Sequence, residues 1–370
     1  MNHVNMRLFL AKLPYTQGLP VQLASSLVWN GQRGVQMFFA ISGFLITSTS
    51  LRRWDSLRKV SLRDFYVLRF ARIAPLLLLL LAVLTLLHIL DLGDFVVPAR
   101  TGGLGRAFVA ALTFHINVLE AHRGYLPGSW DVLWSLSVEE VFYLGFPAAC
   151  RLLGGGKLFI AVLIAFVMLG PFGRTVLARG NEVWQEYSYL GGMDAIALGC
   201  LTAIALARFR MHDAVAHIIG GLGAALLIVS LCFSRQLEAW GLERIGVDMS
   251  ITAVGTCMVI AATAQSGWRS SALLNPLKAL GERSYEVYLT HMFVVFSLFG
   301  LFVIAGKPPA AVPILFISTI LAAGFLGEWV ARCYSEPMNR LLRSYWGENP
   351  SRIGAVIDDR SFLATDNQTD

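Results

Sequence analysis

The stretch from Ile73 to Leu90 reads IAPLLLLLLAVLTLLHIL and contains no Asp, Glu, Lys or Arg. At 1.5 Å of rise per residue, this run forms a helix about as long as the hydrocarbon core of a bilayer is thick, roughly 30 Å. Similar apolar runs recur along the chain. Because lipid offers no partner to a backbone N–H or C=O group, recurrent runs of this length predict transmembrane helices.

The composition of the 370-residue chain leads to the same conclusion. Apolar residues make up 56% of the chain and charged residues 15%, whereas a soluble domain carries about 25% charged residues. Too few polar side chains remain to cover a globular surface in water. The predicted fold class is therefore all-α, a polytopic transmembrane helical bundle.

About nine segments are expected to span the membrane, and a shorter apolar segment at 105–121 is expected to form a re-entrant or interfacial helix. The chain is divided into a membrane domain, residues 1–343, and a polar tail, residues 344–370. The expected spans are 34–50, 72–91, 138–153, 157–178, 187–208, 214–233, 248–265, 284–306 and 310–333.

The net charge of +6 arises from basic residues in the short segments between the apolar runs. The positive-inside rule produces this distribution, so we exclude a nucleic-acid-binding protein. The arginine-rich segment 51–72 indicates the cytoplasmic side, which puts the loop 92–137 outside and the C-terminus in the cytoplasm. The five cysteines lie in or beside apolar runs and none forms a CxxC pair, so we assign no metal ligands.

The segment WSLSVEEVFY, Trp134 to Tyr143, places two carboxylates at the start of an apolar helix. Ser137 and Glu140 have the spacing of a reciprocal capping box, which gives Glu140 a structural explanation. Glu139 is not needed for this box, and a carboxylate at membrane depth is by default a functional candidate. The alternative, that Glu139 only helps to start the helix, stays open because the positive helix end favours carboxylates.

Arg69 and Arg72 lie three residues apart in FYVLRFARIAP, residues 65–75, and therefore share one helix face. We place them at the cytoplasmic mouth of the bundle. One interpretation is membrane anchoring by positive charge. The other is a clamp for phosphate, because guanidinium groups match phosphate oxygens in a bidentate way that Lys does not.

Two further segments place polar or small residues within apolar helices. In LGERSYEVYLTH, residues 280–291, Tyr288 and His291 belong to one polar stripe. His291 is either a proton carrier or a hydrogen-bonded packing group. In GVQMFFAISGFLIT, residues 34–47, a Ser-Gly pair in mid-span permits close approach of a second helix.

Taken in order, these segments resemble the acyltransferase family 3 membrane proteins, which include bacterial O-acetylases of lipopolysaccharide O-antigen, peptidoglycan, exopolysaccharide and Nod factors. Gln36 stands where the family pattern usually has Asp. The order of the motifs covers residues 3 to about 340. The matching segments are 34–46, 65–75, 134–144, 280–291 and Tyr334 to Pro337.

The resemblance implies ten spans, both chain ends in the cytoplasm, and transfer of an acyl group from cytoplasmic acyl-CoA to an extracytoplasmic sugar hydroxyl. The family's first helix usually bears a basic residue, then ten residues, then an essential histidine. His3 looks like that histidine, and the basic residue would lie eight positions before Met1. We therefore expect the first helix to be truncated in this chain.

On this resemblance, the expected function is that of a membrane O-acyltransferase in the bacterial inner membrane. Its co-substrate is acyl-CoA, usually acetyl-CoA, its acceptor is a cell-surface saccharide or glycolipid, and no bound cofactor is expected. His3 would take the acceptor's proton or be acylated itself, and Glu139 would orient its imidazole. Arg69 and Arg72 would bind acyl-CoA at the opposite membrane face. The residues expected to receive the acceptor or shape the site are Trp134, Ser137, Glu140, Tyr143, Tyr288 and His291.

A polytopic transporter of a small anionic or sugar substrate is the alternative, because it too would place Arg, Glu and His within the membrane. Such a transporter is expected to show internal repeats and broken helices in paired positions, which we do not find in the sequence. Substrate flux without CoA consumption favours the transporter. Loss of a cell-surface ester on gene deletion favours the enzyme.

Overall fold

The computed structural model describes residues 1–13, 15–16, 20–24, 28–265 and 271–346. Within these ranges the regular structure is helical and no strand occurs, which confirms the predicted all-α fold class. Seven helical segments among them are long and apolar enough to cross a membrane. Of the polar tail expected at 344–370, residues 347–370 lie outside the described residues.

The seven candidate spans contain the long helices of the bundle. The two other expected spans form helices of 21 and 18 residues that are less apolar, α8 (Leu133–Leu153) and α14 (Asp248–Gln265). The long helices of the seven are α3 (Gly31–Trp54), α4 (Leu62–Ile89), α9 (Lys157–Arg174), α11 (Tyr189–Arg208), α12 (Asp213–Cys232), α16 (Ser284–Ile304) and α17 (Val312–Val330).

Shorter helices fill the connections. The apolar segment 105–121 falls into two of them, and neither is long enough to cross a bilayer. The short helices are α1 (Asn2–Leu10), α2 (Val21–Ala24), α5 (Gly103–Leu112), α6 (Ile116–Arg123), α7 (Gly128–Asp131), α10 (Glu182–Tyr187), α13 (Ser234–Ala239), α15 (Asn275–Glu282) and α18 (Glu336–Tyr345).

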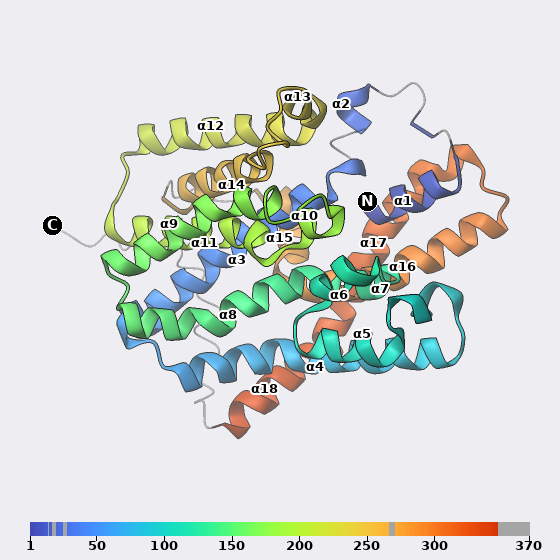
Figure 1. Ribbon diagram of the computed structural model, residues 1–370, viewed down its shortest axis with the longest axis horizontal. Coiled ribbons are helices and arrows are strands. Elements are labelled where there is room, and N and C mark those ends of the chain that lie inside the picture. The colour runs from blue at the N-terminus through green and yellow to red at the C-terminus, as the bar shows by residue number, and fades with distance from the viewer. Residues whose placement is uncertain (14, 17–19, 25–27, 266–270, 347–370) are drawn as a thin grey trace.

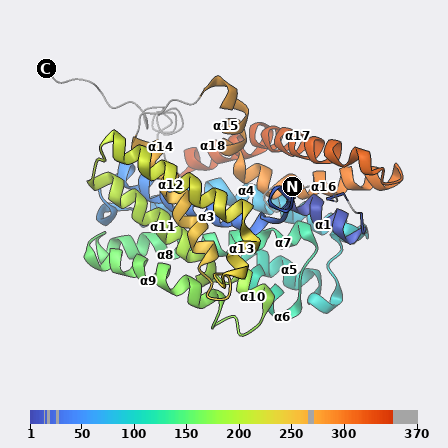
Figure 2. The same cartoon turned by 90° about the horizontal axis from the view of Figure 1, so that it is seen from above.

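The long helices lie side by side, with α3 in the interior of the bundle (Figure 1). α3 packs against α11 and α14, and α11 packs in turn against α9. α16 and α17 form a second packed pair, which runs along one side of the molecule in the perpendicular view (Figure 2). The polar segments singled out in the sequence are thereby carried on neighbouring helices.

Two glycines allow α3 and α11 to touch. A Cβ atom at Gly43 would stand 2.0 Å from the carbonyl oxygen of Ile196, and one at Gly199 would stand 2.0 Å from that of Ala40. Any larger side chain would therefore separate the two backbones. The mid-span Ser-Gly pair thus permits the close approach that the sequence predicted.

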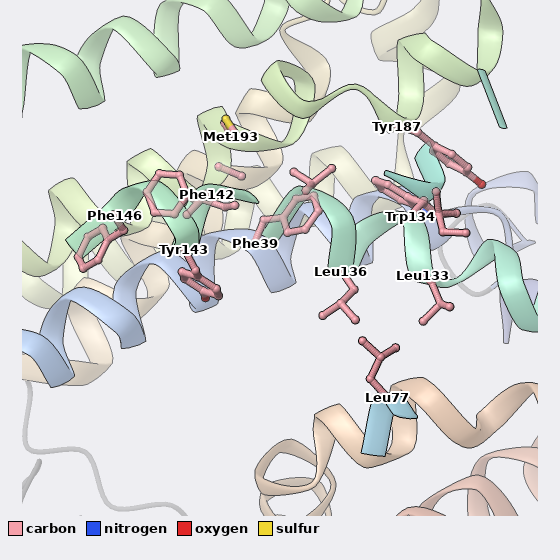
Figure 3. Close-up of a cluster of buried hydrophobic side chains, with 14 of the residues drawn as sticks. Phe39, Leu77, Leu133, Trp134, Leu136, Phe142, Tyr143, Phe146, Tyr187 and Met193 are labelled. Atoms are coloured by element: carbon pink, nitrogen blue, oxygen red, sulfur yellow. The ribbon is translucent and has the colours of Figure 1, made fainter. Parts of the chain in front are cut away.

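Aromatic side chains fix α8 between α3 and α10. The rings of Trp134 and Tyr187 stack with centroids 4.1 Å apart and face each other in Figure 3. Phe39 of α3 meets the edge of Trp134 at 6.1 Å. Each such pair contributes about 0.5–1.5 kcal/mol beyond the area it buries. These contacts hold in place the helix that carries Glu139 and Glu140.

Candidate active site

The N-terminus of α8 differs from the prediction. The helix begins at Leu133, with Val132 as its N-cap. Ser137 lies inside the helix, where its hydroxyl donates to the carbonyl oxygen of Leu133 and accepts from the N–H of Ile116. The predicted capping box of Ser137 and Glu140 is therefore wrong. Burial of Leu133 and its neighbours in the core extends the helix by a turn before the serine.

Glu139 and Glu140 share one guanidinium group. Each residue is 7% exposed. Arg69 Nη2 lies 3.1 Å from Glu140 Oε1 and 3.7 Å from Glu139 Oε1. The guanidinium also covers the ring of Tyr143, 3.6 Å from its centroid. Because buried carboxylates are costly without a cationic partner, Arg69 is what allows two of them to stand side by side.

This contact corrects the expected position of Arg69, which we had placed at the membrane face opposite Glu139. α4 begins at Leu62, well before the apolar run, so Arg69 lies about two turns inside the helix and not at its mouth. Its long side chain reaches α8 from there. The arginine and the glutamates therefore belong to one site.

Ser42 and Tyr143 complete the surroundings of Glu139. Both hydroxyl groups donate to Glu139 Oε1, Tyr143 from 2.7 Å, and the two hydroxyls also contact each other. Ser42 was seen in the sequence only as part of a packing pair. The available signal was a hydroxyl in mid-span, since a polar side chain inside an apolar helix needs a hydrogen-bond partner on a neighbouring helix. We refer to Ser42, Arg69, Glu139, Glu140 and Tyr143 as the carboxylate group.

Arg72 pairs with a different acid, Glu286 of α16. The distance from Arg72 Nη1 to Glu286 Oε1 is 3.1 Å, and the glutamate side chain is 0% exposed. Tyr285, its neighbour in the chain, donates from its hydroxyl to the carbonyl oxygen of Ile73. Sequence reasoning missed Glu286, although a charge within an apolar helix is itself a signal of function.

His3 lies beside His291, with ring centroids 5.2 Å apart. The ring of His291 is 5.8 Å from that of Tyr288, whose hydroxyl lies 2.6 Å from the Ser135 hydroxyl. We refer to His3, Ser135, Tyr288 and His291 as the histidine group. The polar stripe of 280–291 thus contributes Tyr288 and His291 to one group.

The structure brings Glu139 to Arg69 and not to His3. No hydrogen bond or ion pair joins His3 to Glu139 in the part of the chain that is described. Phe38 of α3 belongs to the surroundings of the histidine group, because its ring is stacked on Tyr288 with centroids 6.2 Å apart. The predicted imidazole–carboxylate couple is therefore replaced by two separate polar groups.

Two aromatic residues expected to receive the acceptor are enclosed. Trp134 is 4% exposed and Tyr143 is 2% exposed. The faces of both rings are already occupied, that of Trp134 by Tyr187 and that of Tyr143 by Arg69. Neither offers an open ring face to a sugar.

A further pair of carboxyl groups lies in the connection before α8. Glu120 is 0% exposed, and its Oε1 accepts from the N–H of Leu126. Burial raises the pKa of Asp131 to about 7. Burial, together with the nearby Asp131, raises the pKa of Glu120 well above its usual value. Asp131 also accepts a hydrogen bond from the Tyr187 hydroxyl at 3.1 Å. Sequence reasoning used Glu120 only to mark the end of an apolar segment.

The described residues contain no group of three or more His, Cys, Asp or Glu side chains placed to hold a metal ion. Cys150, Cys200 and Cys257 are buried free thiols. They lie at apolar packing positions, as free cysteines commonly do.

Comparison with known proteins identifies the family to which the sequence is similar. Residues 8–328 match a family model described as an acyltransferase domain. The chain is 26% identical over 282 residues to the peptidoglycan O-acetyltransferase OatA of Listeria monocytogenes, which covers 71% of this chain and 44% of that protein. It is 23% identical over 323 residues to the O-acetyltransferase OatA of Staphylococcus aureus. This match covers 84% of this chain and 53% of that protein.

The chain therefore spans about half the length of the curated relatives it matches. No solved structure matches it. The family match includes the whole carboxylate group together with Tyr288 and His291, whereas His3 lies before its first residue. Because the match extends over most of the sequence, this chain belongs to the acyltransferase family 3 of membrane proteins.

Proposed function

We propose that this protein is an inner-membrane O-acetyltransferase that moves an acetyl group from cytoplasmic acyl-CoA to a hydroxyl of a cell-surface saccharide. The relatives named for O-acetylation, one of them of peptidoglycan, support the saccharide as acceptor. The observation that carries the proposal is the carboxylate group. Three helices of an apolar bundle bring two acids, one arginine and two hydroxyls to a single point.

Packing alone does not account for this arrangement. Ionised groups inside a membrane bundle are costly and mark functional positions. Here Arg69 is held on three sides, by Glu139, Glu140 and the ring of Tyr143. A guanidinium fixed in this way is preorganised to bind an anionic group of the acyl donor.

The proposed reaction forms a C–O bond between the acceptor oxygen and the acyl carbon while the C–S bond of the thioester breaks. The acceptor's proton passes to an imidazole and from there to the departing thiolate, as in general acid–base catalysis. We assign the imidazole to His3, with His291 beside it. An acyl-histidine intermediate on His3 is the second route to the same products. Glu139 serves by holding Arg69 and Tyr143 and not by orienting His3.

We assign the donor to the side of α4 that carries both arginines. The side chains of Arg69 and Arg72 are 23% and 33% exposed, whereas the side chain of Glu286 is 0% exposed. A ligand therefore has access to part of each arginine side chain even though a carboxylate holds its guanidinium. Such partly open forks match the phosphate oxygens of acyl-CoA. The donor side is the cytoplasmic one by the charge distribution, and the C-terminus lies there too.

The test uses the full chain purified in lipid nanodiscs with acetyl-CoA and peptidoglycan oligosaccharides. We expect release of CoA together with a base-labile acetyl ester on the saccharide. His3→Ala and Glu139→Gln should each lower the rate at least 100-fold. Glu328→Gln is the control, because Glu328 pairs with Arg283 away from both polar groups.

Full activity in both variants would contradict the assignment of the site. Movement of a sugar or anion across sealed vesicles without any CoA release would support the transporter instead.

A further inference from the structure

Two hollows open beside the N-terminal end of α3 and share a wall. The larger has a volume of about 770 Å³ and the smaller of about 250 Å³. We refer to them together as the α3 hollow, with a larger and a smaller lobe, because they share lining residues, and the volume of the larger lobe is typical of ligand-binding pockets. The residues that line both lobes are Arg174, Gln185, Arg235, Glu238 and Glu243.

The smaller lobe leads into the bundle and ends at a buried amide. Gln36 and Phe39 of α3 line this end. Gln36 is 3% exposed, and its Nε2 donates to the carbonyl oxygen of Gly191 at 3.1 Å. Its Oε1 has no hydrogen-bond partner among the described residues. Because buried polar atoms are nearly always paired, this oxygen indicates a place for a donor from a bound molecule.

The inner end of the hollow lies about one helical turn along α3 from the carboxylate group. Gln36, Phe39 and Ser42 follow one another at intervals of three residues, so they lie along one face of α3. The rise from Phe39 to Ser42 is about 4.5 Å. Ser42 in turn donates to Glu139. A molecule bound at Gln36 is therefore about two helical turns from Ser42, the serine that donates to Glu139.

The rim of the hollow carries balanced charge. Arg235 and Arg244 face the same space as Glu238 and Glu243, and all four residues are exposed. An anionic nucleotide such as CoA is recognised by an excess of positive charge, which this rim lacks. Mixed donors and acceptors suit a molecule with many hydroxyl groups, because each hydroxyl both donates and accepts.

An aromatic ring adds a second feature of sugar-binding sites. Trp29 lines the smaller lobe and is 48% exposed, so part of its ring is accessible to a ligand. Its edge contact with Phe9 of α1, at 5.5 Å, holds the ring in place. Phe9 belongs to the same short helix as His3. The rim ring and the proposed base are therefore positioned by one element.

We propose that the α3 hollow binds the acceptor saccharide. Gln36 Oε1 accepts a hydrogen bond from a hydroxyl or an N-acetyl N–H of the sugar, and this contact holds the sugar beside Trp29, whose partner Phe9 lies on the helix that carries His3. The inference rests on the proposed acetyltransferase function. It adds the place where the acceptor, and not acyl-CoA, binds, and it replaces the enclosed Trp134 and Tyr143 in that role.

The experiment measures binding and turnover separately on the full chain in nanodiscs. The probe is radiolabelled N-acetylglucosaminyl-N-acetylmuramic acid disaccharide, whose binding is followed by equilibrium dialysis without acetyl-CoA. Gln36→Met keeps the length of the side chain and removes the amide, and we expect about tenfold weaker binding of the disaccharide. Arg235→Ala, at an exposed position, should weaken binding a few-fold without affecting folding.

The matched control is Gln236→Met, on the same short helix as Arg235 but outside the lining of the hollow. It should bind the disaccharide as the unsubstituted protein does. In Gln236→Met, the KM for acetyl-CoA and the slow release of CoA into water should also stay unchanged, and in the two lining variants the KM for acetyl-CoA should not rise.

Unchanged dissociation constants in both Gln36→Met and Arg235→Ala would overturn the α3 hollow as the acceptor site. So would the absence of disaccharide binding by the unsubstituted protein, or a raised KM for acetyl-CoA in either variant. If the unsubstituted protein binds the disaccharide but neither hydrolyses acetyl-CoA nor transfers acetyl, the proposed enzymatic function fails and the binding site stands.

Discussion

A single guanidinium in this bundle pairs with two carboxylates, and the guanidinium one helical turn away pairs with a third. Arg69 stands between Glu139 and Glu140, and Arg72 stands against Glu286. Removing the cation from such a pair costs more than the pair itself contributes, because it leaves a charge buried without a partner. Replacement of an arginine that pairs with a buried acid is therefore expected to destabilise the fold, whereas replacement of an arginine that contacts only a ligand is not.

We expect Arg72→Ala to lower the free energy of unfolding by about 3 kcal/mol, because Glu286 is left buried and unpaired. The double variant Arg72→Ala, Glu286→Gln should recover most of this loss, since the amide needs no cation. Thermal unfolding in detergent measures both. If the double variant is no more stable than the single one, the ion pair is not what Arg72 contributes to the fold.

A pH effect is expected from Asp131 and Glu120. Their carboxyl groups titrate near pH 4 in the unfolded chain, whereas burial raises the pKa of Asp131 to about 7 in the fold. Over this interval the folded state binds more protons, so its stability falls as the pH rises from about 4 to about 7. Hydrogen exchange of residues 116–131, corrected for the intrinsic rate, should therefore be slower at pH 5 than at pH 7.5.

The variant Glu120→Gln is the control for this effect. Its amide oxygen is able to keep the bond from the N–H of Leu126, while the ionisable group beside Asp131 is lost. The difference in exchange between the two pH values should shrink. Protection that increases with pH in the unsubstituted protein would contradict the assignment of raised pKa values.

At the scale of elements, the helices extend beyond the apolar runs that define them. α4 begins ten residues before Arg72, and α8 begins at Leu133. In both cases polar or aromatic residues continue the helix because their side chains pack against neighbouring helices. These extra turns bring Arg69 and Glu139 into the same layer of the bundle.

The contact of α3 with α11 depends on the absence of a side chain at Gly43. A Cβ at this position would lie 2.0 Å from a backbone oxygen of α11. Gly43→Ala should therefore destabilise the protein by about 1–3 kcal/mol, measured by thermal unfolding. It should also displace Ser42 from Glu139 and lower any acetyl transfer.

Gly145→Ala is the matched control, because a Cβ on this mid-helix glycine of α8 meets nothing within 4 Å. It should be neutral or slightly stabilising, since Ala favours the helix over Gly. Equal stability of the two variants would show that the close contact contributes little.

For the whole molecule, the charge distribution predicts the sidedness of the loops. In a Cys333→Ser background, a membrane-impermeant maleimide applied to intact spheroplasts should label Arg100→Cys and should not label Arg210→Cys. Both positions are exposed in the structure, so access and not burial decides the result. Permeabilising the membrane should expose the second cysteine as a control. The reverse pattern would invert the proposed donor and acceptor sides.

The sequence by itself determined the fold class, the approximate spans and the family. A long apolar run in lipid forms a helix, because only then are its backbone N–H and C=O groups hydrogen-bonded within the segment. Five motifs in the same order are specific enough to identify the family. It also predicted Arg69, Arg72 and Glu139 as charged residues of the site, which stays a prediction. These conclusions follow from local composition and spacing, which the chain carries without reference to its partners.

Only the tertiary structure decided which side chains of different helices contact each other. Glu139 meets Arg69 and Ser42, while His3 meets His291, because helix lengths and the glycine contacts set the height of each side chain in the bundle. Glu286 and the unpaired oxygen of Gln36 became visible in the same way. Helical spacing tells which residues share a face of one helix, but the partner of that face is fixed by packing between helices.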